Sequence, residues 1–168
     1  MVDYILSLDP GGTSGWAYGR FNATTPYECL RHGMISNGIE GFIKWWDEEV
    51  QFWSLDLVVS ESFQLRGVVN PDITPLRIEG ALSVLRPGVI YQPPAAKMHA
   101  KDAVLRRYGL WWPGAGHDRD GLRHALAYLK LQGHKPTMEK MGLREGYSLC
   151  ENCYLKAYKN GRCDYCGK

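Results

Sequence analysis

The first third of the chain carries its apolar residues in short runs that are typical of β-structure. The run at 4–8 stops at 9–12, where proline removes a hydrogen-bond donor and two glycines permit a sharp turn. Further apolar runs at 15–20 and 29–36 flank a turn at 22–26. We therefore predict a first strand that continues into an antiparallel hairpin.

The pattern then changes to a helical period. Apolar residues recur every three or four positions over 38–53, which predicts an amphipathic helix. A short apolar strand follows at 57–61, and it ends on Glu61 as the first strand ends on Asp9. A helix between two strands favours a parallel, right-handed connection, so both carboxylates are expected at one edge of the sheet.

The remaining pattern completes an α/β domain with a mixed five-stranded sheet flanked by helices. A strand is predicted at 88–92, and helices at 74–85, 96–108 and 118–131. Gly133 and Pro136 end the last helix. We expect three parts: a main domain over 1–133, a linker over 134–148 and a small module over 149–168.

Composition and charge narrow the class of protein. The chain has 168 residues, of which 45% are hydrophobic and 23% charged, as in folded globular domains. It lacks both a signal-like start and an apolar run that could span a bilayer, so we expect a cytoplasmic protein with no membrane partner. The net charge is only +2, yet residues 86–135 hold nine basic and three acidic side chains. Such a stripe suits a polyanion such as nucleic acid.

Further candidate site residues lie at the start of the last predicted helix. At 100° per residue, His117, Asp120 and His124 share one edge of that helix. If the helix begins over the sheet edge, His117 and Asp120 join Asp9 and Glu61. Two ionised carboxylates about 4 Å apart repel by roughly 4 kcal/mol at an effective dielectric constant of 20. Divalent cations remove this repulsion, and oxygen ligands favour Mg²⁺ or Mn²⁺, which serve in phosphodiester hydrolysis.

Plainer interpretations of the same residues stay open. Asp9 is also suited to a turn, and Glu61 to the exposed end of a strand. Asp118 is expected to cap the helix N-terminus rather than to bind metal. We expect His124 to orient Asp120 or to face solvent rather than to be a ligand.

These motifs resemble the RuvC-type Holliday junction resolvases of the RNase H-like superfamily over residues 3–131. The resemblance rests on LSLDPGGTSGWA with Asp9, VVSESF with Glu61, YQPPAAK with Lys97 and HDRDGLRHAL with His117 and Asp120. It implies an RNase H-like fold and a homodimeric, metal-dependent endonuclease that cuts branched DNA, leaving a 5′-phosphate and a 3′-hydroxyl.

The resemblance also implies individual roles. Asp9, Glu61 and Asp120 would hold two Mg²⁺ (or Mn²⁺) ions, and His117 would be a ligand or place the attacking water. Phe63 comes one residue before the position of the family's stacking aromatic, and the family's glycine-rich insertion after Lys97 is missing. The candidate DNA-binding residues are Phe63, Arg66, Lys97, Lys101 and Arg106.

The C-terminal segment has a separate metal motif. Cys150-x-x-Cys153 and Cys163-x-x-Cys166 are separated by nine residues. Four thiolates in this spacing predict one structural Zn²⁺ in a zinc-ribbon-like module, whereas disulfides would require an oxidising compartment. DNA recognition and support of a dimer are equally compatible with such a module.

Three other functions compete with a DNA junction nuclease. An RNA-processing nuclease of the same superfamily would share the carboxylates. A small-molecule kinase of the actin-like fold would use residues 9–13 as a phosphate loop, although no second glycine-rich repeat occurs. A noncatalytic zinc-ribbon adaptor would only bind DNA. The small size and the added tail are compatible with a bacteriophage protein acting in an infected bacterial host.

Overall fold

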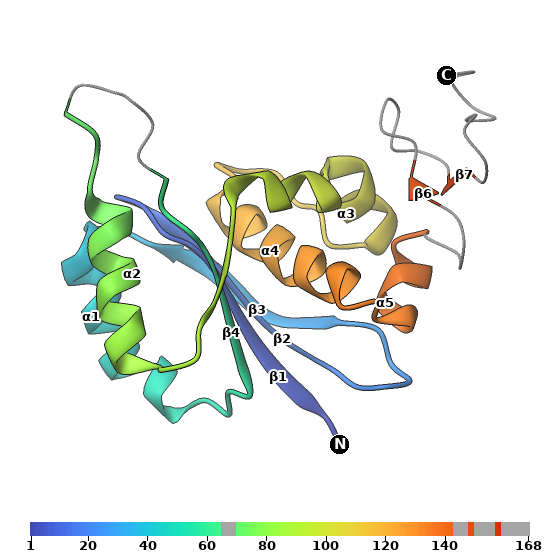
Figure 1. Ribbon diagram of the computed structural model, residues 1–168, viewed down its shortest axis with the longest axis horizontal. Coiled ribbons are helices and arrows are strands. Elements are labelled where there is room, and N and C mark those ends of the chain that lie inside the picture. Colours follow the sequence, from blue (N-terminus) through green and yellow to red (C-terminus); the bar gives the residue numbers. More distant parts are fainter. Residues whose placement is uncertain (65–69, 143–147, 150–156, 159–168) are drawn as a thin grey trace.

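The computed structural model describes residues 1–64, 70–142, 148–149 and 157–158. Its centre is a five-stranded sheet in the order β3-β2-β1-β4-β5 (Figure 1). The strands β1, β2 and β3 are antiparallel neighbours, whereas β1, β4 and β5 are parallel. The predicted mixed five-stranded sheet is therefore confirmed. The strand bounds are β1 Asp3–Asp9, β2 Ser14–Phe21, β3 Glu28–Ile35, β4 Leu57–Glu61 and β5 Ile90–Gln92.

Helices cover both faces of this sheet (Figure 1). One face carries α1 (Gly38–Glu48) and α2 (Thr74–Leu85), and the other carries α3 (Asp102–Tyr108), α4 (His117–Leu131) and α5 (Lys135–Lys140). Two 3₁₀ segments connect the layers, η1 (Val50–Phe52) and η2 (Pro94–Ala100). The result is a three-layer α/β arrangement.

Strand alternation divides the apolar residues into two cores. In β1, Leu6 and Leu8 pack towards α1 and α2, whereas Ile5 packs towards α4. Because side chains alternate across a strand, Asp9 shares a face with Ile5 and lies on the α4 side. The same argument places Glu61 with Val59 on that side. Strand periodicity thus presents both carboxylates to α4.

Two glycines allow α4 to lie directly on β2. A Cβ atom added to Gly15 would lie 1.6 Å from the carbonyl oxygen of His117. A Cβ added to Gly121 would lie 2.8 Å from the Cα atom of Trp16. Both positions therefore require glycine for the backbones to approach this closely. This contact fixes the first turn of α4 over the end of the hairpin.

The helix boundaries differ from the predictions in two places. The helix predicted over 38–53 ends at Glu48 and is followed by η1, which turns the chain towards β4 while Val50 stays buried. The helix predicted over 96–108 is interrupted at Lys101, whose backbone is extended. The interruption frees the Ala100 carbonyl oxygen, which accepts a hydrogen bond from Arg123 Nε at 3.2 Å.

The segment after α4 carries more structure than a linker requires. Helix α5 lies within the predicted linker, and Thr137 and Met141 are fully buried. Farther along, β6 (Ser148–Leu149) pairs antiparallel with β7 (Ala157–Tyr158). The zinc cysteines proposed from the sequence lie outside the described residues. No helix within the described ranges has the length and apolarity needed to cross a membrane.

Candidate active site

Three polar residues form a row across the parallel strands. Leu8 pairs with Ser60, so Asp9 and Glu61 occupy the next positions of their strands. Glu61 in turn pairs with Gln92, the last residue of β5. All three positions end a strand and face α4. The sequence-based expectation that Asp9 and Glu61 meet at one sheet edge agrees with this register.

Asp120 and Lys97 complete a cluster above this row. The Nζ atom of Lys97 lies 3.2 Å from Asp9 Oδ1, 2.8 Å from Glu61 Oε2 and 3.8 Å from Asp120 Oδ2. The three carboxylates are 13%, 19% and 29% exposed, respectively. Residues far apart in the sequence thus surround one cationic group that remains accessible to solvent.

The electrostatics of this cluster favour an additional cation. Burial raises the pKa of Asp9, repulsion from Glu61 and Asp120 adds to the rise, and Lys97 opposes it, which leaves that pKa at about 6. Burial also acts to raise the pKa of Glu61, but hydrogen bonds from His124 and Lys97 lower it to about 2. Burial acts to lower the pKa of Lys97, yet the carboxylates raise it overall, so Lys97 stays charged.

The donor set fits a hard divalent ion. Carboxylate oxygens from three elements converge, and single ligand atoms of Asp9, Glu61 and His124 lie within 4.8 Å of one another. Mg²⁺ and Mn²⁺ prefer such oxygen donors, with water filling the other positions. The ammonium group of Lys97 lies among the three carboxylates, so this is the place in the cluster where a positive charge is stabilised.

His124 does not behave as the sequence predicts. The side chain is completely buried, and its Nε2 atom lies 2.9 Å from Glu61 Oε2. Its Nδ1 atom lies 2.9 Å from the side-chain amide of Gln92. The expectation that His124 orients Asp120 or faces solvent is therefore wrong. The reason is that α4 lies over β1 and β2, and its inner edge reaches the ends of β4 and β5, where Glu61 and Gln92 lie.

Asp120 is instead oriented by Arg123, one turn along α4. The guanidinium group forms ion pairs with Asp120 and with Asp102. It also donates to the Ala100 carbonyl. Arg123 thereby ties one oxygen of Asp120 to the junction of η2 and α3, while the other oxygen faces Lys97.

Asp118 lies one residue inside α4 rather than at the N-cap position predicted from the sequence. The N-cap of α4 is Gly116, whose φ of 96° favours glycine, and Asp118 lies in the first turn. Its Oδ2 atom accepts a hydrogen bond from Trp112 Nε1 at 2.7 Å and lies 2.9 Å from His32 Nδ1. Asp118 is therefore not the N-cap residue, but its Oδ1 atom accepts a hydrogen bond from the backbone N–H of Arg119 at 2.8 Å, so it does satisfy one first-turn amide as the sequence predicts.

The remaining candidate residues are spread around the site. His117 begins α4 and is half-buried; its backbone contacts Gly15. Lys101 precedes α3, and Arg106 is exposed on α3, where its guanidinium lies 3.4 Å from the ring centre of Trp111. Arg66 lies outside the described residues.

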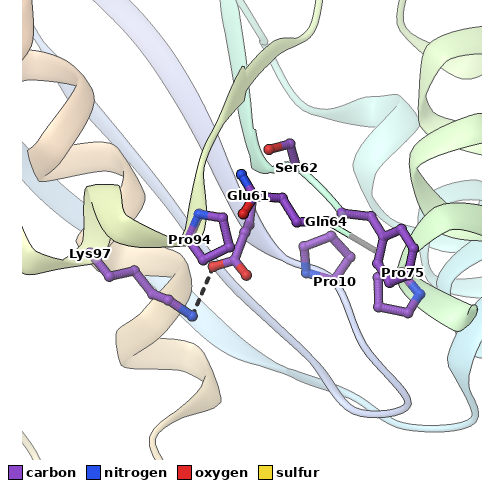
Figure 2. Close-up of a pocket in the computed structure, with 8 residues that line it drawn as sticks. Pro10, Glu61, Ser62, Gln64, Pro75, Pro94 and Lys97 are labelled. Carbon is purple, nitrogen blue, oxygen red and sulfur yellow. Dashed lines mark ion pairs between the residues drawn. The ribbon is translucent and has the colours of Figure 1, made fainter. Parts of the chain in front are cut away.

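A pocket opens beside Glu61. It has a volume of about 340 Å³ and is lined by Phe63, by Lys97 and by prolines from three segments. Figure 2 shows Lys97 reaching towards the Glu61 carboxylate past Pro94, with Pro10 and Pro75 on the opposite side. The pocket therefore joins the charged cluster to a rigid, partly apolar surface.

Sequence reasoning missed two contributors to this site. Gln92 ends the third parallel strand as Asp9 and Glu61 end theirs, so strand-end position was an available signal. Arg123 lies three residues after Asp120, a helical spacing at which opposite charges meet. The contact between His124 and Glu61 has no such local signal, because it depends on how α4 crosses the sheet.

Comparison with known proteins defines the fold. No protein-family model matches the sequence, and neither does any curated protein. RuvC from Thermus thermophilus is 16% identical, with a TM-score of 0.59, and the alignment covers 80% of this chain and 98% of that chain. The structure of T. thermophilus RuvC in complex with a Holliday junction gives 17% identity and a TM-score of 0.60 with the same coverage. The likeness shows that this chain has the fold of RuvC.

Proposed function

We propose that this protein is a metal-dependent endonuclease that cleaves branched DNA, with a four-way junction as its substrate. The observation that carries the proposal is the convergence of Asp9, Glu61 and Asp120 within 4 Å of the Lys97 ammonium group. The likeness to a RuvC structure bound to a Holliday junction supports this choice of substrate. The two opposed strands of such a junction call for a homodimer.

The proposed chemistry assigns each group a task. Asp9, Glu61 and Asp120 would hold two Mg²⁺ or Mn²⁺ ions, which activate water and stabilise the leaving oxygen when bound. Arg123 keeps the Asp120 carboxylate in place. Lys97 stays protonated and supplies a positive charge for the scissile phosphate. His117, at the start of α4, is proposed to assist the attacking water.

Binding of DNA is assigned to surfaces next to this cluster. Phe63 lines the pocket beside Glu61 and offers an aromatic ring to an unpaired base. Lys101 precedes α3 and Arg106 lies on it, and Arg66 is proposed to add a phosphate contact. The module with Cys150, Cys153, Cys163 and Cys166 is proposed to hold one structural Zn²⁺.

The test is cleavage of labelled substrates by the purified full-length chain. Four-way junction, flap, linear duplex and RNA are incubated with Mg²⁺, and the products are resolved on denaturing gels. We expect symmetric cuts in the junction. Asp9→Asn should abolish cleavage and retain junction binding in a gel-shift assay, because the change removes a charge while preserving the shape of the side chain.

Each alternative function has its own outcome in this assay. Preferential RNA cleavage would replace the DNA proposal with an RNA-processing nuclease. Binding without cleavage at any Mg²⁺ or Mn²⁺ concentration would favour an adaptor. Full activity of Asp9→Asn would remove the metal assignment.

A further inference from the structure

His124 and Gln92 form a buried pair behind the carboxylate cluster. His124 is 0% exposed and Gln92 is 5% exposed. His124 comes from α4 and Gln92 from the end of β5, and they meet directly behind Glu61. Buried polar groups require partners, so the hydrogen-bond pattern here determines where the imidazole proton resides.

The surroundings of the Gln92 amide fix its orientation. One end lies 3.2 Å from the carbonyl oxygen of His124 and 2.9 Å from His124 Nδ1, and the other end lies 3.2 Å from the backbone N–H of Tyr128. A carbonyl oxygen can only accept and a backbone N–H can only donate. Both ends of the Gln92 amide have suitable partners only when its nitrogen faces His124 and its oxygen faces Tyr128.

This orientation decides the tautomer of His124. An amide N–H that donates to Nδ1 requires Nδ1 to carry a lone pair. The proton of the neutral imidazole is then on Nε2, from which it is donated to Glu61 Oε2 at 2.9 Å. A protonated Nε2 has no lone pair for a metal ion, although it lies among the possible ligand atoms of the cluster.

We propose that His124, set in its Nε2–H tautomer by Gln92, is a positioning residue that orients Glu61 and does not bind metal. The inference rests on the proposed function of the carboxylate cluster as a metal site. His124 and Lys97 both contact Oε2 of Glu61, at 2.9 Å and 2.8 Å. These two contacts hold the carboxylate through one oxygen, and the proposal assigns the other oxygen, Oε1, to the cation. Buried partners of this kind fix the orientation of metal-binding side chains in other proteins.

The first test is the protonation of each ring nitrogen in the full-length protein. Selective ¹⁵N labelling of histidine, with the His124 signals assigned by His124→Gln, distinguishes protonated from unprotonated nitrogens by chemical shift. We expect Nε2 to carry the proton and Nδ1 to lack it, both before and after Mg²⁺ is added. A proton on Nδ1, or loss of the Nε2 proton when Mg²⁺ binds, would overturn the proposal.

A matched pair of variants tests the positioning role by Mg²⁺ titration calorimetry. The amide of His124→Gln can reach the place of Nε2 and donate to Glu61, whereas His124→Asn reaches only the place of Nδ1. We expect His124→Gln to bind Mg²⁺ close to the wild-type affinity and His124→Asn to bind roughly 10–100-fold more weakly. Equal affinities in the two variants, whether both retained or both reduced, would contradict the proposal.

These measurements separate the inference from the proposed function. Urea denaturation of both variants shows whether they fold, and the tautomer of the wild-type protein decides the question if they do not. None of the readouts uses DNA. The protein could show the expected tautomer and Mg²⁺ affinities and yet cleave no nucleic acid. That result would contradict only the proposed nuclease function.

Discussion

Replacing Gly121 with alanine should disturb the contact that places α4 over the sheet. The new Cβ atom would lie 2.8 Å from Trp16 Cα, 2.9 Å from Trp16 N and 3.0 Å from Gly15 C, whereas ordinary contact begins at 3.4 Å. All three neighbours are backbone atoms, so no side-chain rotation relieves the overlap. Helix α4 must instead move away from β2, taking the adjacent Asp120 with it.

A second helical glycine provides the control. Gly80 lies inside α2, and a Cβ atom added there meets nothing within 4 Å. Both substitutions gain the same helix propensity, about 1 kcal/mol. Gly80→Ala should therefore raise the free energy of unfolding by roughly 0.5–1 kcal/mol. Overpacking costs roughly 1–3 kcal/mol, so Gly121→Ala should be less stable than Gly80→Ala by that amount.

Urea denaturation of both variants and the wild type, followed by tryptophan fluorescence, measures this difference. Mg²⁺ affinity provides a second readout, and we expect it to fall in Gly121→Ala and to stay unchanged in Gly80→Ala. If Gly121→Ala stabilised the protein as much as Gly80→Ala does, the close contact between α4 and β2 could not be what positions Asp120.

Three further predictions address charge and metal content. Asp9→Asn should stabilise the magnesium-free protein at pH 8 by roughly 1–3 kcal/mol, because Asp9 is ionised there although its pKa is raised to about 6. That gain in stability should shrink as the pH falls from 6 towards 4, because native Asp9 binds a proton more tightly than Asp9 in the unfolded chain. Urea denaturation across this pH range measures the gain. A gain that does not change with pH would contradict the raised pKa of Asp9. Lys97→Met should bind Mg²⁺ at least about tenfold more tightly in calorimetry, since the change removes a competing positive charge from the carboxylates. The variant should nevertheless cleave more slowly, because it lacks the positive charge proposed for the scissile phosphate. Weaker Mg²⁺ binding would count against a cation site among the carboxylates that surround Lys97. Elemental analysis should find about one zinc per chain, lost in Cys150→Ser/Cys153→Ser, and unchanged zinc in that variant would exclude the module.

Local patterns carried much of the fold. Short apolar runs and the 3.6-residue period located the five strands of the main sheet and the helices α2 and α4, since buried strands and amphipathic helices require those patterns. Chain order then placed Asp9 and Glu61 at one edge, because a helix between parallel strands connects them with a fixed hand. The helix ends were less well predicted, as the interruption at Lys101 shows.

The order of strands and helices and the carboxylates at strand ends can be read from the amino-acid sequence alone, because each follows from neighbours within a few residues. Tertiary structure decided that His124 meets Glu61, that Lys97 lies among the carboxylates and that Gln92 sets the histidine tautomer. A helical wheel shows which residues share an edge but not what that edge faces. That depends on the angle and depth at which α4 crosses the sheet, which steric contact at Gly15 and Gly121 fixes only once the chain has folded.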